Sequence, residues 1–165
     1  MIRPSDRVRA IAERRAGEYG EDTMLAQKTR YALRALLYLA GAEPGRSVQV
    51  GDIATTQRVP RKYLELILLD LKRAGFVNSR RGPGGGYTLA KTPAEISFAE
   101  VIRLMDGPIA LVPCASLNFY ERCQDCHDEA NCAIRRVMAK VREDAVRTLA
   151  GTSLADAVAF EALVA

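Results

Sequence analysis

The chain has 165 residues, of which 48% are hydrophobic and 27% charged, so it can bury a core in one compact unit or two small ones. It has no apolar run near the ~20 residues that a bilayer span needs, and its start lacks the apolar stretch of a signal peptide. The formal net charge is +4. We therefore expect a cytoplasmic protein with no membrane partner.

The positive charge is concentrated in the middle of the chain. Residues 24–95 carry twelve Lys and Arg against five Asp and Glu, whereas residues 96–165 carry seven against ten and residues 1–23 carry five of each. Residues 1–23 also show no firm apolar period, and we interpret them as an N-terminal extension. The basic middle is the candidate surface for an anionic partner.

Residues 25–74 have the pattern of a helix-turn-helix. Apolar periodicity predicts a helix over 25–40 and another over about 61–74, with a short helical stretch at 50–57 before a break at 58–60. Pro60 suits a helix start and Gly75 suits a left-handed helix end. Two helices joined by a tight turn, the second of them basic and polar on its outer side, are typical of a DNA-binding helix-turn-helix.

Two short strands, at 76–80 and 87–90, should flank the glycine-rich segment 81–86, which is where a wing would sit. The glycines lack the spacing of nucleotide-binding loops and precede a strand, which argues against a phosphate-binding loop. Ser97 and Glu100 have the spacing of a capping box and predict a helix through Met105.

A long helix is expected from about 128 to 149, with an apolar stripe along one face. A second copy of the chain is the simplest cover for such a stripe, and packing wholly within the subunit is the alternative. The stripe consists of Ile134, Val137, Met138, Val141, Ala145 and Leu149. The predicted fold class is therefore mainly α with a small β-hairpin wing, a winged helix-turn-helix followed by a long C-terminal dimerisation helix.

All four cysteines lie just before this helix, at positions 114, 123, 126 and 132. Clustered thiolates in a reducing compartment can hold an iron–sulfur cluster or zinc, and the spacing alone leaves both open, together with a metal-free thiol switch. A redox enzyme that uses Cys123 and Cys126 as a dithiol would need a βαβ unit around them, and none is predicted. His127 is adjacent but is not assigned as a ligand, because a lone loop histidine is more often solvent-exposed.

Residues 24–40 (MLAQKTRYALRALLYLA), residues 59–91 (VPRKYLELILLDLKRAGFVNSRRGPGGGYTLAK) and the cysteine loop together resemble one family. This is the Rrf2 family of winged helix-turn-helix transcriptional regulators, whose members include IscR, NsrR and RirA. The likeness covers about residues 24–150 and implies a non-enzymatic regulator. It implies a DNA-binding domain at 24–95 and, at 96–165, a connecting helix, a cysteine-rich sensor loop (114–132) and a dimerisation helix.

The resemblance also implies a homodimer on a two-fold operator in double-stranded DNA, with the helix at 61–74 in the major groove and the wing near the minor groove. The residue chemistry agrees: Arg61 and Lys62 can reach phosphates or base edges, and Glu65 can accept from a cytosine amino group. Arg81 suits a narrow minor groove. The candidate DNA-binding residues are Lys28, Arg61, Lys62, Tyr63, Glu65, Arg80, Arg81, Gly82, Pro83, Gly84, Gly85 and Gly86.

Cluster-binding members of the family carry three cysteines in this loop, which tilts the expected cofactor toward an iron–sulfur cluster, 2Fe–2S or 4Fe–4S, with zinc second. The family's fourth ligand is a His beyond the last cysteine or an acidic residue before the first-helix Tyr, and here these positions are Arg135 and Arg30. Neither can bind a cation, so the resemblance implies an all-cysteine site. Its ligands would be Cys114, Cys123, Cys126 and Cys132.

Overall fold

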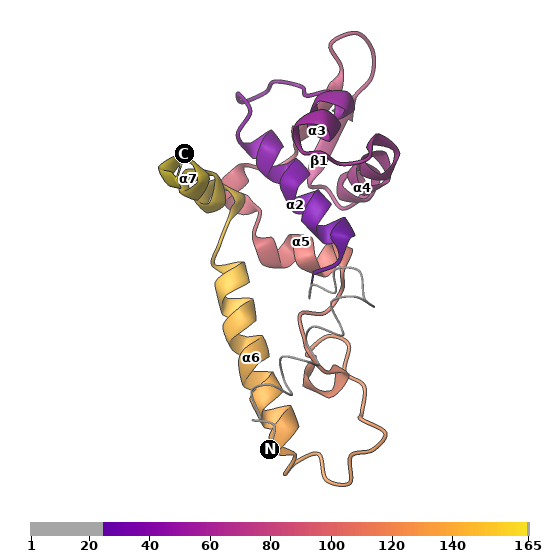
Figure 1. Cartoon of the computed structure of the whole chain (residues 1–165), viewed down its shortest axis with the longest axis vertical. Coiled ribbons are helices and arrows are strands. Elements are labelled where there is room, and N and C mark those ends of the chain that lie inside the picture. The colour runs from indigo at the N-terminus through magenta and orange to yellow at the C-terminus, as the bar shows by residue number, and fades with distance from the viewer. Residues whose placement is uncertain (1–24, 165) are drawn as a thin grey trace, which may run out of the picture.

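The structure, a computed structural model, describes residues 25–164, so the predicted extension at 1–23 lies outside the described residues. Its helices and strands follow one another along the chain as shown in Figure 1. They are α2 (Gln27–Ala40), α3 (Val50–Thr56), α4 (Arg61–Arg73), β1 (Val77–Arg80), β2 (Gly86–Leu89), the 3₁₀ turn η1 (Pro93–Glu95), α5 (Phe98–Met105), the 3₁₀ turn η2 (Pro113–Ala115), α6 (Ala133–Ala150) and α7 (Leu154–Val164).

The predicted fold class is confirmed: a mainly helical chain carries one antiparallel hairpin, in which Val77 pairs with Leu89 and Arg80 with Gly86. The helix-turn-helix is α3 and α4, and the wing follows it directly. None of the helices within residues 25–164 is long and apolar enough to cross a membrane.

A single hydrophobic core joins α2, α3 and α4 to the start of the hairpin. Leu36, Ile53 and Leu68 are fully buried in it, as the helical spacing requires. Ile96, Val101 and Leu154 belong to the same core, so its packing crosses the predicted domain boundary at residue 95. The region beyond 95 is therefore attached to the helices and hairpin before it through buried side chains as well as through the chain itself.

Local signals end several of these elements where the sequence predicts. Gly75 adopts φ +78, and the N–H of Phe76 donates to the carbonyl of Leu71, which closes α4. The capping box before α5 is present, since the N–H of Glu100 donates to Ser97 Oγ while the Glu100 carboxylate accepts from the Ser97 N–H.

The C-terminal region differs from the prediction at the start of the long helix and in one additional helix. The long helix begins at Ala133 instead of about 128, because the Asp128 carboxylate accepts from the N–H groups of Ala130 and Asn131 and holds a turn there. The chain also forms α7, which was not predicted and which packs against α2.

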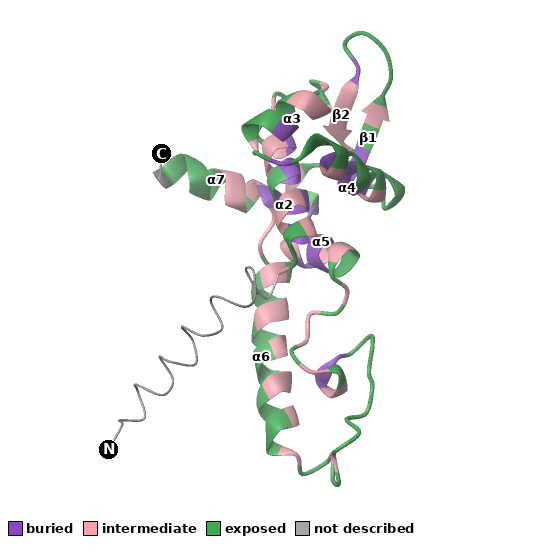
Figure 2. Cartoon of the chain, turned by 45° about the vertical axis from the view of Figure 1, so that its right-hand side comes forward, coloured by how far each residue is buried: buried purple, intermediate pink, exposed green. Residues whose placement is uncertain are grey.

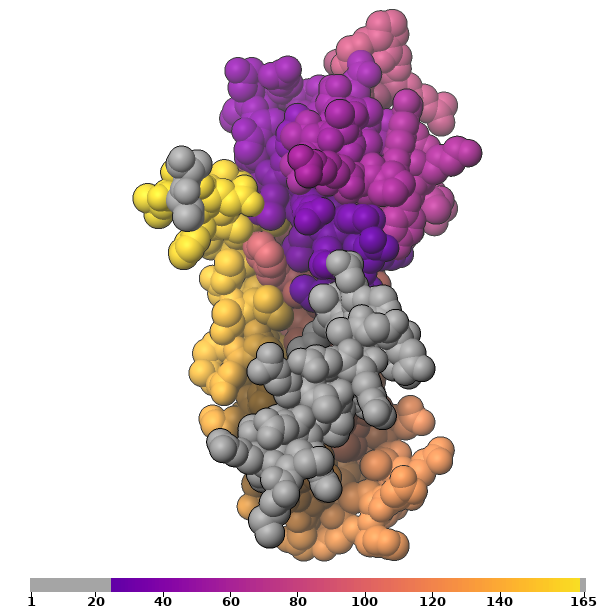
Figure 3. All heavy atoms as spheres, in the orientation of Figure 1, coloured from indigo at the N-terminus to yellow at the C-terminus, as the bar shows by residue number. Residues whose placement is uncertain are grey.

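Helix α6 extends away from the core with the cysteine loop beside its first turns (Figure 1). Figure 2 shows no buried residue along it. The side facing the loop packs on η2 and on α5. Figure 3 shows the wing and the cysteine loop at opposite ends of the long axis.

Candidate functional site

The turn between α3 and α4 fixes the angle at which α4 meets solvent. Arg58 adopts φ +52, and the N–H of Val59 donates to the carbonyl of Ala54 at 2.9 Å. Val59 is buried in the core and Pro60 caps α4. Because the inner face of α4 is fully buried along its length, the opposite face is held outward rigidly.

The outward face carries the predicted contact residues at its start. Arg61, Lys62 and Glu65 are exposed, and Arg61 Nε lies 3.1 Å from Glu65 Oε1. Tyr63 is only half-buried at the edge of the core, where its ring meets Tyr31 edge-on with 5.9 Å between centroids. This packing fixes the Tyr63 ring relative to α2.

The same face exposes Leu66 and Leu69, which sequence reasoning did not single out. Periodicity arguments select the apolar residues that repeat on one side of a helix, and these two leucines lie off that stripe. The sequence did contain a signal for them, because apolar residues opposite the buried stripe of a helix must face solvent or a partner.

The wing extends beyond α4, with its tip away from the rest of the molecule (Figure 1). Arg80 and Arg81 are exposed, as are Gly82, Pro83 and Gly84. Gly85 is different: it is buried, and its N–H donates to the carbonyl of Gly82 at 2.8 Å. Its backbone therefore closes the tip and does not face outward.

Gly86 has its own packing requirement. Tyr87 and Val48 exchange two backbone hydrogen bonds of 2.8 and 2.9 Å, which tie the wing to the segment before α3. A Cβ on Gly86 would lie 2.3 Å from the carbonyl oxygen of Val48. The glycine is thus needed for the wing to dock, whatever the wing then contacts.

Lys28, predicted as a phosphate contact, has a partner within the chain. Its Nζ lies 2.8 Å from Oδ2 of Asp70, so the ion pair joins the start of α2 to α4. Both side chains are about one-third exposed, where such pairs contribute little to stability. A phosphate would have to compete with Asp70 for this ammonium group.

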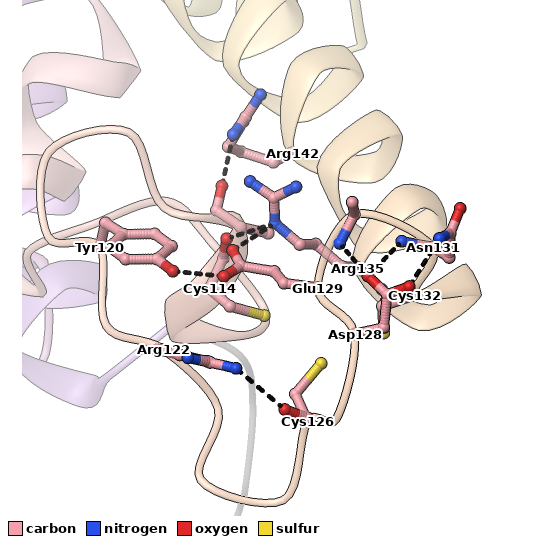
Figure 4. Close-up of polar contacts among 12 residues, drawn as sticks. Cys114, Tyr120, Arg122, Cys126, Asp128, Glu129, Asn131, Cys132, Arg135 and Arg142 are labelled. Carbon is pink, nitrogen blue, oxygen red and sulfur yellow. Dashed lines mark hydrogen bonds and ion pairs between the residues drawn. The ribbon is translucent and has the colours of Figure 1, made fainter.

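The four cysteines come from three pieces of chain that meet at the start of α6. Cys114 lies in η2, Cys123 and Cys126 in the following loop, and Cys132 at the N-cap of α6. All four line one cavity of about 640 Å³, which also includes His127. Figure 4 shows Cys114 and Cys126 directing their sulfur atoms toward the space between their segments.

Polar contacts hold this loop against α6 (Figure 4). Arg135 Nε donates to the carbonyl of Cys114 at 3.1 Å and lies 3.0 Å from Glu129 Oε1, which places the guanidinium between the two ends of the loop. Tyr120 donates to Glu129 at 2.5 Å. Arg142, further along the helix, donates to the carbonyl of Ala115.

The cysteines are close enough to influence one another. Burial raises the pKa of the Cys126 thiol, and the neighbouring Cys132 and Cys123 raise it further. The Arg135 N–H donates to Cys132 Sγ at 3.5 Å. Within residues 25–164, however, no three Cys, His, Asp or Glu side chains converge on a position for a single metal ion.

Four cysteine thiols form a donor set that can hold an iron–sulfur cluster or one zinc ion. Zinc requires four ligands at about 2.1–2.3 Å from a single point. A cluster accepts four thiolates on different iron atoms, so its ligands are spread around a cavity instead of converging. All four cysteines line one cavity, so thiolate donors suited to either group are gathered in one place.

Helix α6 leaves part of its predicted apolar stripe uncovered. Ile134, Val137 and Val141 are 67%, 57% and 42% exposed, and they lie on one side of the helix. Met138, Ala145 and Leu149 are half-buried. An exposed apolar row on a long helix is typical of a surface that another protein covers.

Comparison with known proteins gives the same overall picture. Residues 25–159 match the sequence profile of the family described as Rrf2, iron-dependent transcriptional regulator. An rrf2-like HTH-type transcriptional regulator of Rhodobacter capsulatus is 49% identical over 121 residues, which span 72% of this chain and 81% of that protein.

Two solved structures are similar over most of their length. CymR (YrzC), the global cysteine regulator of B. subtilis, is 29% identical with a TM-score of 0.69, covering 82% of this chain and 96% of CymR. T. potens IscR is 26% identical with a TM-score of 0.66, covering 85% of this chain and 89% of IscR.

Proposed function

The chain belongs to the Rrf2 family of transcriptional regulators, and we propose that it is a homodimeric DNA-binding regulator controlled by an iron–sulfur cluster on its cysteine loop. As a member of that family it is not an enzyme. The observation that carries the cluster proposal is the single cavity lined by all four cysteines at the start of α6. The proposed ligands are Cys114, Cys123, Cys126 and Cys132.

For DNA, we propose that α4 enters the major groove while the wing lies near the minor groove. The exposed Arg61 and Lys62 supply charge for phosphates or base edges, and Arg80 and Arg81 do the same from the wing. On α4, the exposed Glu65 carboxylate would accept a hydrogen bond from a cytosine amino group. Two copies related by a two-fold axis would place two such units on a two-fold operator.

For the dimer, we propose that the exposed row on α6 packs against its equivalent in a second copy. A two-fold interface requires one surface that is complementary to itself, and an apolar helix face meets that requirement. The row of Ile134, Val137 and Val141 starts two residues after Cys132, so the dimer contact and the cysteine site would share the first turns of α6.

When bound, the cluster would supply bonds to the four thiolates that form or break with iron supply and redox conditions. The chain's own residues would carry the consequence. Arg135 and Arg142 already hold the η2 carbonyls of Cys114 and Ala115 against α6. Ligation would add a second restraint on the same segment and so fix the loop, and α6 with it, in one arrangement.

A thiol switch is the second candidate, because Cys126 and Cys132 lie within hydrogen-bonding reach of one another. A two-electron oxidant such as a peroxide would join them in a disulfide, with loss of both thiol protons. Such a switch would need no metal, so the metal content of the protein separates it from the cluster proposal.

Protein purified without oxygen distinguishes these functions through its visible spectrum and its iron, sulfide and zinc content. We expect brown protein with iron and acid-labile sulfide, lost in Cys126→Ser and in Cys123→Ser. The control is His127→Ala, which changes the same cavity wall and should keep its iron. Full iron in Cys126→Ser, or colourless protein with stoichiometric zinc, would refute the proposed site.

DNA binding is tested separately by titrating labelled duplex with the same protein at low ionic strength. The affinity should fall steeply as salt is added, because neutralised phosphates release their counterions. Failure to bind any duplex at low salt would refute the DNA-binding proposal while leaving the metal analysis intact.

A further inference from the structure

Two exposed leucines occupy the middle of the face that α4 turns to solvent. Leu66 is 61% and Leu69 40% exposed, whereas Leu64, Ile67, Leu68 and Leu71 on the opposite side are fully buried. At about 100° per residue, Leu66 and Leu69 lie about 60° apart and opposite the buried stripe. They form a short apolar strip on the helix that the fold presents outward.

The surroundings of this strip are charged. Lys62 precedes Leu66 by four residues and Arg73 follows Leu69 by four, so both cations lie on the same face of α4. Lys72 and the wing residues Arg80 and Arg81 are exposed nearby along the chain. An apolar strip between cations is complementary to a partner that offers negative charge with apolar points between.

Double-stranded DNA has that chemistry in its major groove. The phosphates lie along the groove edges, and the C5-methyl group of each thymine projects into the groove floor, where it is the apolar feature that a side chain can read. A protein partner with acidic and apolar residues would satisfy the strip too, but it would not account for the helix-turn-helix geometry that places α4 outward beside a wing.

Resting on the DNA-binding function proposed above, we propose that Leu66 and Leu69 recognise thymine methyl groups in each operator half-site. The neighbouring Glu65 carboxylate would disfavour a position directly against phosphate and so direct this part of α4 toward base edges. Leu66 and Leu69 thus contribute to sequence preference, while phosphate contacts of Lys62 and the wing arginines add affinity for any duplex.

The test replaces thymine by uracil, which removes only the C5-methyl group. The full chain, purified without oxygen, first selects duplexes from a random library, and each thymine of the selected half-site is then exchanged for uracil in turn. Burying one methyl group is worth about a fourfold change in Kd. We expect about fourfold weaker binding at one or two positions, measured by fluorescence anisotropy.

The variants Leu66→Ala and Leu69→Ala should each lose the difference between thymine and uracil at one of those positions. Leu104→Ala, which shortens an exposed leucine on α5, is the matched control and should keep the difference. Circular dichroism verifies that each variant is folded. Because the leucines are exposed, their truncation leaves no cavity in the core.

Three results would overturn the proposal: a selected half-site without thymine, equal affinity for thymine and uracil at every position, or an unchanged difference in both leucine variants. In each of these cases duplex is still bound and the DNA-binding function stands. If no duplex is bound at low salt, the DNA-binding function fails and methyl recognition fails with it.

Discussion

Replacing Gly86 by alanine should detach the wing from the segment before α3, to which Tyr87 and Val48 tie it. The added Cβ would lie 2.3 Å from the carbonyl oxygen and 2.6 Å from the carbonyl carbon of Val48, which are backbone atoms and cannot move aside as a flexible side chain would. Relief requires β2 to withdraw, which breaks the two hydrogen bonds between Val48 and Tyr87. The φ of +150 at Gly86 adds strain for any residue with a Cβ.

The expected cost follows from these losses. Two backbone hydrogen bonds contribute about 1 kcal/mol each, and an unfavourable backbone conformation adds about 1 kcal/mol, so Gly86→Ala should lower the free energy of unfolding by about 3 kcal/mol. Chemical denaturation followed by circular dichroism measures this directly. In heat denaturation the same change would lower Tm by about 6–12 °C.

Gly84→Ala is the control for this prediction. Gly84 also has a positive φ, +76, but a Cβ added there would have nothing within 4 Å, so only the backbone strain of about 1 kcal/mol applies. The difference between the two variants isolates the contact with Val48. If Gly86→Ala were no more destabilising than Gly84→Ala, the docking of the wing through Val48 would be refuted.

Three further predictions concern the charged residues. Lys62→Ala should reduce the slope of log Kd against log salt by about 0.9 if Lys62 neutralises one phosphate, and an unchanged slope would exclude that contact. Hydrogen bonds from Ser97 hold the pKa of Glu100 below its usual value, so this carboxylate stabilises the fold at neutral pH and stops doing so as the pH falls through its folded-state pKa. Glu100→Gln should therefore be less stable than wild type at neutral pH. The difference between their denaturation midpoints should become smaller as the pH is lowered. Arg135→Ala should speed proteolysis within residues 114–132, because it frees the Cys114 carbonyl, whereas the exposed neighbour Arg136→Ala should not.

The helix-turn-helix could be predicted because its signals are local. The spacing of Leu64, Ile67, Leu68 and Leu71 fixes the buried side of α4, and Pro60 and Gly75 lie at its two ends. Helix α7 gave no comparable signal: its apolar residues are spread around the helix axis instead of forming one stripe. Its position is determined by Leu154, which enters a core built from residues far away in the sequence.

In the candidate sites, too, features that are local in sequence could be predicted, and contacts between distant residues could not. The cysteines could be predicted as a group because they are close in sequence. Their common cavity could not, because it includes a contact between Arg135 and Cys114, 21 residues apart. The Lys28–Asp70 pair spans 42 residues, and nothing local to Lys28 indicates it. Gly86 was predicted as part of the DNA-contacting loop, and the approach of Val48 is a second reason for a glycine there that the sequence did not indicate.

The proposed cysteine site and the proposed DNA-contacting helix α4 are connected through the C-terminal end of α6. The helix has 18 residues and is about 27 Å long, with Cys132 at its start. Just beyond its end, the N–H of Leu154 donates to the Ile96 carbonyl and the N–H of Phe98 to the Thr152 carbonyl, at 2.9 and 3.1 Å. The Leu154 side chain is buried in the core that also holds the inner face of α4. These hydrogen bonds and the buried Leu154 tie the segment that follows α6 to the core, so we expect a change in the tilt of α6 to move the core and α4 with it. In a dimer built on α6, such a tilt alters the distance between the two α4 helices and leaves the residues on each α4 unchanged. The response to the cysteine site should then appear as a changed preference for half-site spacing, with the base preference within each half-site the same in both forms.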